Sequence, residues 1–121
     1  MVVVGVVIVL GGGGVVSNPL RYPADHIRKG LLREHPLGSR SADVQAWLDA
    51  QQWRDRAHHE QVGLYWQDPG RRPEVIGSKS LAAHLGHYQG FPWRVNVEAF
   101  WAFDDQDRLI EVKVRKSADS L

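Results

Sequence analysis

Residues 94–103 (RVNVEAFWAF), 104–107 (DDQD) and 109–115 (LIEVKVR) form the stretch that decides the fold. In the first segment apolar and other side chains alternate, and the third segment repeats the pattern after a polar turn. Because successive side chains of a strand point to opposite faces, each segment predicts a strand with one buried face. Together they predict an antiparallel hairpin, in which Trp101 faces the core and Phe100 the opposite side.

The residues before this hairpin also have β character. Residues 62–66 (VGLYW) predict a strand closed by the turn-forming triplet at 68–70 (DPG), and residues 74–77 are candidates to pair with it. Residues 79–88 are ambiguous, since their Leu and Ala residues alternate as in a strand but also fit a helical turn. Gly86, Gly90 and Pro92 favour a strand that ends in a loop.

Two helices are expected upstream of the strands. Pro23 suits a first helical turn, and that helix should end near Pro36. A second helix is expected over residues 41–52, capped by Ser39 or Ser41. Its apolar residues recur at i, i+3 and i+4.

The expected fold class is therefore α+β. Two N-terminal helices pack on a three- to four-stranded antiparallel meander sheet, preceded by an apolar helix. The expected divisions are residues 1–17 as a hydrophobic anchor or signal segment, 18–35 as a linker and the first helix, and 36–121 as the α+β domain.

Composition excludes several classes of protein. A chain of 121 residues is one domain, and 15 Lys and Arg against 14 Asp and Glu leave a net charge of +1. That balance does not suit a nucleic-acid binder. The absence of Cys excludes disulfides, thiolate metal sites and cysteine nucleophiles.

The apolar lead at residues 2–16 carries no charged side chain. It fits a membrane anchor, a signal peptide cleaved near Ser17, or a buried strand. A helix over it would rise about 22 Å, less than the roughly 30 Å hydrocarbon core. The glycines at 11–14 disfavour a strand, and without a following Lys they do not form a phosphate loop. The sequence therefore favours a membrane-anchored or exported chain.

The orientation in a membrane stays open. Arg21, Arg28, Lys29 and Arg33 follow the apolar lead, and the positive-inside rule then places the domain in the cytoplasm. Basic residues upstream of a different start site would reverse that assignment.

Two segments resemble a known family. Residues 36–48 (PLGSRSADVQAWL) look like the opening of SmpA/OmlA-type small bacterial envelope domains, a Gly-Ser pair followed by V-x-x-x-L. Residues 100–112 (FWAFDDQDRLIEV) are similar to their terminal hairpin. The family shares its layout with the β-lactamase inhibitor protein, and the resemblance implies a non-catalytic interaction domain. The chain lacks the lipobox Cys of the outer-membrane-assembly members.

Catalytic and metal-binding signatures are weak. Of the six histidines, His58 and His59 precede Glu60, and His84 and His87 are three residues apart. In a strand His84 and His87 would point to opposite faces, whereas in a helix they would share one. No Ser lies in G-x-S-x-G, and the Asp residues at 104–107 lack the spacing of a calcium loop. We expect no catalytic residue, no metal and no cofactor, and a His-based metal-dependent hydrolase is the least favoured function.

Aromatic residues are the remaining candidates for a binding surface. Tyr65, Phe91, Trp93 and Phe100 are the predicted partner-binding face, although a small domain also needs aromatic residues for its core. The predicted function is a non-catalytic, membrane-associated protein-interaction module with an unknown protein partner, held to the membrane by residues 2–16. The alternative is an exported or cytoplasmic inhibitor or immunity-like protein that uses the same face.

Overall fold

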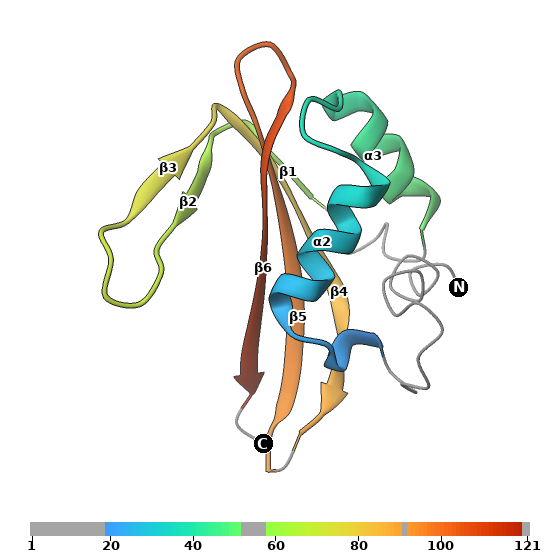
Figure 1. Ribbon diagram of the computed structural model, residues 1–121, viewed down its shortest axis with the longest axis vertical. Helices are drawn as coiled ribbons and strands as arrows, with labels where there is room; N and C mark the ends of the chain where they lie inside the picture. The colour runs from blue at the N-terminus through green and yellow to red at the C-terminus, as the bar shows by residue number, and fades with distance from the viewer. Residues whose placement is uncertain (1–18, 52–57, 91, 120–121) are drawn as a thin grey trace.

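The computed structural model describes residues 19–51, 58–90 and 92–119. The expected apolar helix over residues 1–17 and the predicted site residue Phe91 lie outside this part of the chain. The α+β class is confirmed (Figure 1). The elements in order are η1 (Pro19–Arg21), α2 (Ala24–Glu34), α3 (Ser41–Ala50), β1 (His58–Glu60), β2 (Leu64–Trp66), β3 (Glu74–Ile76), β4 (Lys79–Gln89), β5 (Arg94–Phe103) and β6 (Leu109–Asp119).

The main sheet has four antiparallel strands in the order β1-β4-β5-β6. The predicted hairpin is present as β5 and β6, with Trp101 opposite Val112. Two details differ from the sequence prediction. The three-residue strand β1, too short to show an alternating pattern, was not expected. The predicted pairing of 62–66 with 74–77 occurs as β2–β3, but this pair forms a separate two-stranded sheet, called here the ribbon.

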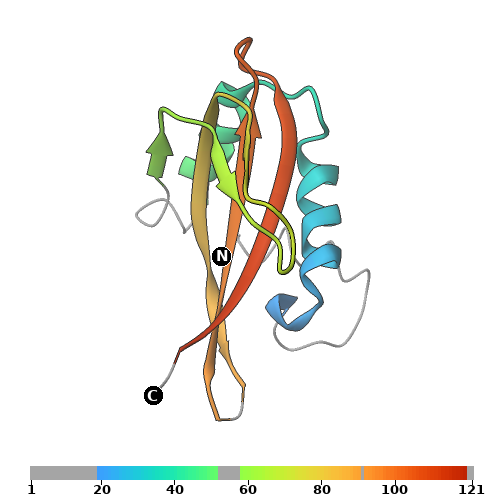
Figure 2. The same cartoon turned by 90° about the vertical axis from the view of Figure 1, so that its left-hand side faces the viewer.

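The helices and the ribbon lie on opposite sides of the main sheet (Figures 1 and 2). Helix α2 buries Ile27 and Leu31, and α3 buries Val44 and Leu48. Each pair is spaced i, i+4, so both side chains face the sheet. We call the helix-covered side the inner face and the other side the outer face.

The start of α3 corrects the capping prediction. Its N-cap is Arg40, and no side chain caps it. Ser39 Oγ instead donates to the Pro36 carbonyl at 2.7 Å. The backbone of the preceding loop is bonded to the β5–β6 turn, because Gly38 N–H donates to the Leu109 carbonyl and Leu109 N–H to the Ser39 carbonyl. This backbone pairing, not a serine cap, positions α3.

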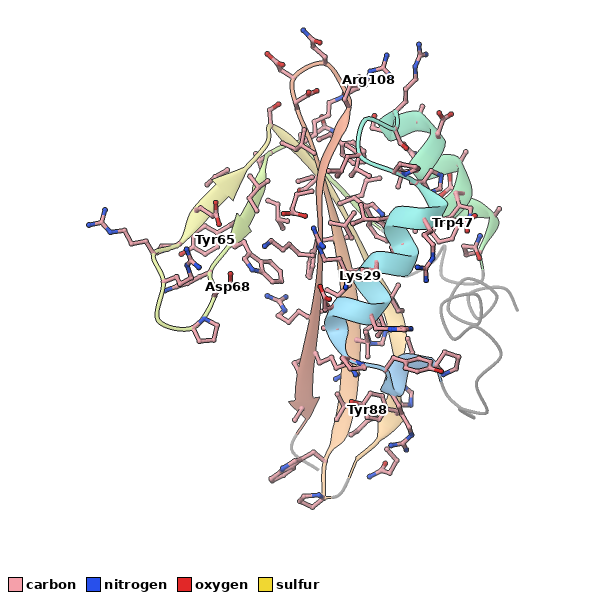
Figure 3. All side chains as sticks on the ribbon, in the orientation of Figure 1. Lys29, Trp47, Tyr65, Asp68, Tyr88 and Arg108 are labelled. Carbon is pink, nitrogen blue, oxygen red and sulfur yellow. The ribbon has the colours of Figure 1, made fainter. Side chains whose placement is uncertain are left out.

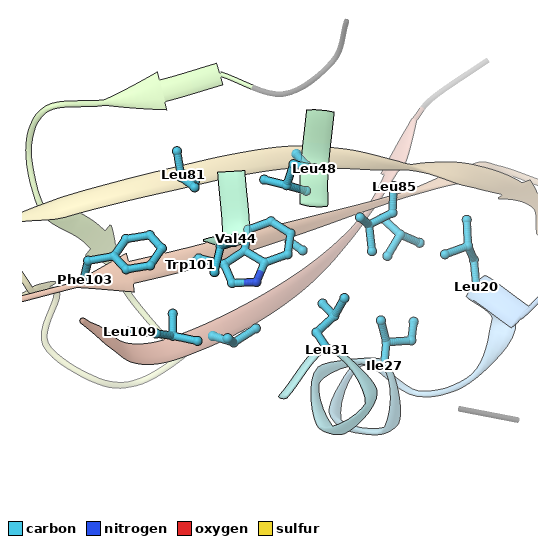
Figure 4. Close-up of a cluster of buried hydrophobic side chains, with 14 residues drawn as sticks. Leu20, Ile27, Leu31, Val44, Leu48, Leu81, Leu85, Trp101, Phe103 and Leu109 are labelled. Carbon is cyan, nitrogen blue, oxygen red and sulfur yellow. The ribbon is translucent and has the colours of Figure 1, made fainter. Parts of the chain in front are cut away.

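The inner face forms the main hydrophobic core (Figure 4). Trp101 and Phe103 are its largest members, as their alternation predicted, and Trp101 is fully buried. The Trp101 indole N–H has no hydrogen-bond partner in the structure. The buried members are Leu20, Ile27, Leu31, Val44, Leu48, Leu81, Ala83, Leu85, Val97, Ala99, Trp101, Phe103, Leu109 and Val112.

A bulge in β4 changes which face its second half presents. The pairing with β5 shifts between His84 and Gly86, and Gly86 has a φ of 139°. His84 therefore stands opposite Glu98, and His87 opposite Asn96. Residues directly opposite each other share a face, so both histidines lie on the outer face, and the expectation that they would separate in a strand is wrong. A Cβ at Gly86 would stand 3.0 Å from Leu20, so glycine also lets η1 pack there.

Candidate functional site

The ribbon is attached to the outer face of the main sheet through Trp66. The Trp66 ring packs edge-on against Phe100 with ring centroids 5.6 Å apart. Its indole N–H donates to Asp68 Oδ1 at 2.9 Å, which satisfies the polar group of the buried ring. Leu64 and Ala102 are buried in the same small cluster, with Ile76 packed against it. One side of the ribbon is thus fixed to β5.

Cations from β6 reinforce this attachment. Lys113 Nζ lies 5.7 Å and Arg115 Cζ 5.8 Å from the centre of the Trp66 ring. Arg115 Cζ is also 4.9 Å from the Phe100 ring, and its guanidinium pairs with Glu98 at 3.3 Å. Contacts between a cation and an aromatic face contribute about 0.5–1 kcal/mol at exposed sites. The ribbon therefore has a defined position on the sheet.

The other side of the ribbon is an exposed apolar surface. Tyr65 and Val75 are directly paired across its two strands, and they are 64% and 66% exposed. Val62, 63% exposed, lies at the base of the ribbon beside Gly63. A Cβ on Gly63 would stand 2.8 Å from Val75 Cγ1 and 2.2 Å from the Gly77 carbonyl oxygen, so the ribbon backbone is tightly packed at this point. We call Val62, Tyr65 and Val75 the ribbon patch.

The structure places the predicted site residues in different surroundings. Tyr65 belongs to the ribbon patch and points away from the sheet (Figure 3), whereas Phe100 lies under Trp66 on the outer face. Trp93, 44% exposed, lies at the β4–β5 turn, away from both. Val75 has no distinguishing sequence signal, because a three-residue strand gives little periodicity. The strict alternation of residues 64–66 was the available signal that Tyr65 faces away from Trp66.

The histidines do not converge in the described part of the chain. His84 Nε2 lies 3.3 Å from Asn96 Oδ1, and Tyr22 stacks on His26 with ring centroids 4.5 Å apart. His35 packs edge-on against Trp47, and burial lowers the pKa of His35 against the opposing charges of Glu34 and Asp43. Residues 58–60 are placed only by backbone register, His58 opposite Ala82 and His59 opposite Leu81. Across residues 19–51, 58–90 and 92–119, no three His, Asp or Glu residues are grouped to hold a metal ion.

An ion pair joins α2 to β6, the strand at one edge of the main sheet. Arg28 on α2 donates to Glu111 Oε1 at 2.6 Å and to the Val112 carbonyl at 2.7 Å. Burial alone would raise the pKa of Glu111. The hydrogen bonds from Arg28 and the Val112 N–H, with the charges of Arg28 and Lys113, outweigh burial and hold the pKa below its ordinary value. The edge groups of Val112 are therefore satisfied within the domain, which fixes α2 on the sheet.

A shallow hollow of about 310 Å³ lies between this ion pair and the ribbon. It is lined by two carboxylates, two cations and three apolar residues, from α2, β2 and the residues after it, and β6: Asp25, Asp68, Arg28, Lys113, Ala24, Trp66 and Val114. Because the carboxylates and cations balance, it does not offer a ligand a strong charge of one sign.

Comparisons with known proteins give no relative. No family model matches the chain, and neither a curated protein nor a solved structure matches it significantly. The SmpA/OmlA-like relationship therefore stays a prediction. Within the described residues, none of the helices has the length and apolar character needed to cross a membrane.

Proposed function

We propose that this chain is a non-catalytic, membrane-associated protein-interaction module that binds its partner through the ribbon patch. The observation that carries the proposal is the pair Tyr65 and Val75, two large apolar side chains directly opposite each other and both about two-thirds exposed. Exposed apolar groups on a rigid support are typical of protein interfaces, where tyrosine is frequently an anchoring residue.

The rigid support comes from the opposite side of the ribbon. Trp66, Phe100 and Ala102 hold the ribbon against β5, so the backbone that carries Tyr65 and Val75 already has its position before binding, which lowers the ordering cost. The turn that joins the two strands of the ribbon carries the exposed Arg71 and Arg72, and charged residues of this kind are typical of the polar rim of an interface.

The test of the partner site uses exchanges that keep the strand geometry. The double variant Tyr65→Ser, Val75→Thr removes most of the apolar surface of the patch. We expect the full-length chain, extracted from cells in mild detergent, to migrate as a complex larger than the monomer, and the double variant to migrate as the monomer. Leu37→Ser is the matched control, since Leu37 is 57% exposed in the loop between α2 and α3. If both variants keep the complex, the patch is not the partner site.

Membrane association rests on the apolar residues 2–16 and is tested separately. A C-terminally tagged chain is fractionated from bacterial cells, and the intact mass of the product is measured. The proposal predicts the full-length mass in the membrane fraction. A product that begins near Asn18 in an exported fraction would instead favour the inhibitor-like alternative, with the same patch as its binding surface.

A further inference from the structure

One end of the domain gathers aromatic and basic side chains where the apolar lead joins it. We call Arg21, Tyr22, Tyr88, Trp93 and Lys116 the Tyr88 end. They come from η1 and the residue after it, from β4, from the β4–β5 turn and from β6. Tyr88 and Arg108 mark opposite ends of the long axis in Figure 3.

Two cations meet at the Tyr88 ring. Arg21 donates to the Gln89 carbonyl at 2.7 Å, and its Cζ lies 4.8 Å from the ring centre. Lys116 Nζ lies 4.9 Å from the same ring and donates to the Tyr22 carbonyl at 2.7 Å and to the Tyr88 hydroxyl at 3.2 Å. Neither cation pairs with a carboxylate within the described residues. Both cations instead donate to neutral oxygen atoms, those of Gln89, Tyr22 and Tyr88.

Trp93 adds an amphipathic ring to the same end. The turn before it is closed by a hydrogen bond from the Gly90 N–H to the Trp93 carbonyl at 2.8 Å, and the Trp93 side chain is 44% exposed. Tryptophan and tyrosine prefer the interfacial region of a bilayer, where the apolar ring meets lipid and the polar group meets water.

The apolar lead enters the domain at this end. Leu20 in η1 is buried and packs against Gly86 of β4, which anchors the entry point to the sheet. Only residues 17 and 18 separate the apolar residues 2–16 from Pro19. Two extended residues span at most about 7 Å. Lead residues buried in a bilayer would therefore hold the Tyr88 end close to its surface.

The opposite end carries acidic and basic side chains in balance. Asp104, Asp105 and Asp107 of the β5–β6 turn lie near Lys79, which pairs with Asp107, and near Arg108, which is bridged to Arg40. An anionic lipid surface attracts Lys and Arg and repels carboxylates. Arg21 and Lys116, which have no carboxylate partner among the described residues, therefore favour the Tyr88 end as the side that faces such a surface.

We propose that the Tyr88 end docks on an anionic bilayer surface, with Trp93 at the interface and Arg21 and Lys116 facing lipid phosphates. This inference rests on the membrane association in the proposed function and adds the docking surface and the lipid charge. It leaves the ribbon patch, whose Tyr65 lies away from Tyr88 in Figure 3, available to a protein partner.

The absence of Cys allows a direct test with single-cysteine labels. Gln89→Cys places a nitroxide at the Tyr88 end, and Gln106→Cys places one on the β5–β6 turn; both side chains are exposed. The full-length chain is reconstituted in vesicles of equimolar phosphatidylcholine and phosphatidylglycerol, and the accessibility of each label to oxygen and to a water-soluble nickel chelate is measured. We expect a several-fold higher oxygen-to-nickel ratio at position 89 than at position 106. Equal ratios at the two positions would overturn the proposal.

A charge variant tests the lipid preference. In Arg21→Gln, Lys116→Gln we expect the ratio at position 89 to fall to its value in pure phosphatidylcholine vesicles. Arg71→Gln, Arg72→Gln removes the same charge from the exposed ribbon turn and is expected to keep the ratio. If the two double variants behave alike, the cations of the Tyr88 end do not bind the lipid. Circular dichroism shows whether Arg21→Gln, Lys116→Gln still folds. If it does not, Trp93→Ser is used in its place, and we expect the same fall in the ratio at position 89. An unchanged ratio in Trp93→Ser contradicts the docking surface.

Two different results separate membrane association from docking of the Tyr88 end. A wild-type chain that does not float with either kind of vesicle contradicts membrane association. A chain that floats but gives equal label ratios contradicts only the docking of the Tyr88 end.

Discussion

The two faces of the main sheet are covered in different ways. The inner face is covered by η1, α2 and α3 over the buried residues of the main core. Among the residues that the structure describes, the outer face is covered where Trp66 of the ribbon rests on Phe100. Adjacent residues of β5 serve both clusters, Trp101 inward and Phe100 outward. The inner face therefore supplies most of the stability, while the outer face carries an attachment with one free apolar side.

The largest expected effect is on the inner face. Trp101→Ala should lower the free energy of unfolding by about 3–5 kcal/mol, because it leaves a cavity at the centre of the core. Trp101→Phe should cost clearly less, since the indole N–H has no partner to lose. Urea denaturation followed by circular dichroism measures both values. Equal losses in the two variants would contradict the position of Trp101 in an apolar core.

A smaller effect is expected on the outer face. Trp66→Ala should lower the free energy of unfolding by about 2 kcal/mol. The ring is buried, but it stabilises the attachment of the short ribbon and not the main core. Amide hydrogen exchange should show loss of protection at residues 64–66 and 74–76 with β5 still protected. Loss of protection throughout β5 would mean that the two faces unfold as one unit.

The ion pair between α2 and β6 should contribute about 1 kcal/mol or less to the free energy of unfolding, as is usual for partly exposed pairs. This contribution depends on pH. The pKa of Glu111 is lower in the folded than in the unfolded chain, so its stabilisation is present above the ordinary value of 4.5 and is lost as the pH falls through the folded pKa. Glu111→Gln should be less stable than the wild type near neutral pH and equally stable in acid. A difference that stays constant from neutral to acid pH would contradict this assignment.

The smallest effect is expected at the ribbon patch. Tyr65→Ser, Val75→Thr should change the free energy of unfolding by less than about 1 kcal/mol, since both side chains are mostly exposed. Thermal unfolding of the double variant and the wild type measures the change. A large loss in the free energy of unfolding would show that the two side chains are needed for folding. It would contradict the interpretation of the patch as a binding surface.

Local periodicity explains what was predictable. The alternation in residues 94–103 was sufficient to predict the β5–β6 hairpin, the burial of Trp101 and the outward position of Phe100, because strand period depends only on neighbouring residues. The helices followed from the same argument with a period near 3.6. In each case the pattern extends over several turns or pleats.

Contacts distant in sequence explain what was not predictable. The bulge at Gly86 lies where Leu20 packs against β4, and it places His84 and His87 on one face contrary to their spacing. The start of α3 has no serine cap, and backbone bonds join Leu109 to Gly38 and Ser39 in the loop before it. Phe100 is partly covered by Trp66, which lies in a separate sheet. None of these pairings leaves a periodic signal in the sequence.

The central claim is that the free side of the ribbon contacts a protein. The most direct measurement is photocrosslinking in intact cells with a photoreactive phenylalanine derivative at position 65 of the full-length chain, and at position 37 as the exposed control. We predict a discrete protein adduct from position 65, absent from position 37 and lost when Val75→Thr is added. Adducts of equal yield at both positions, or none at position 65, would contradict the claim.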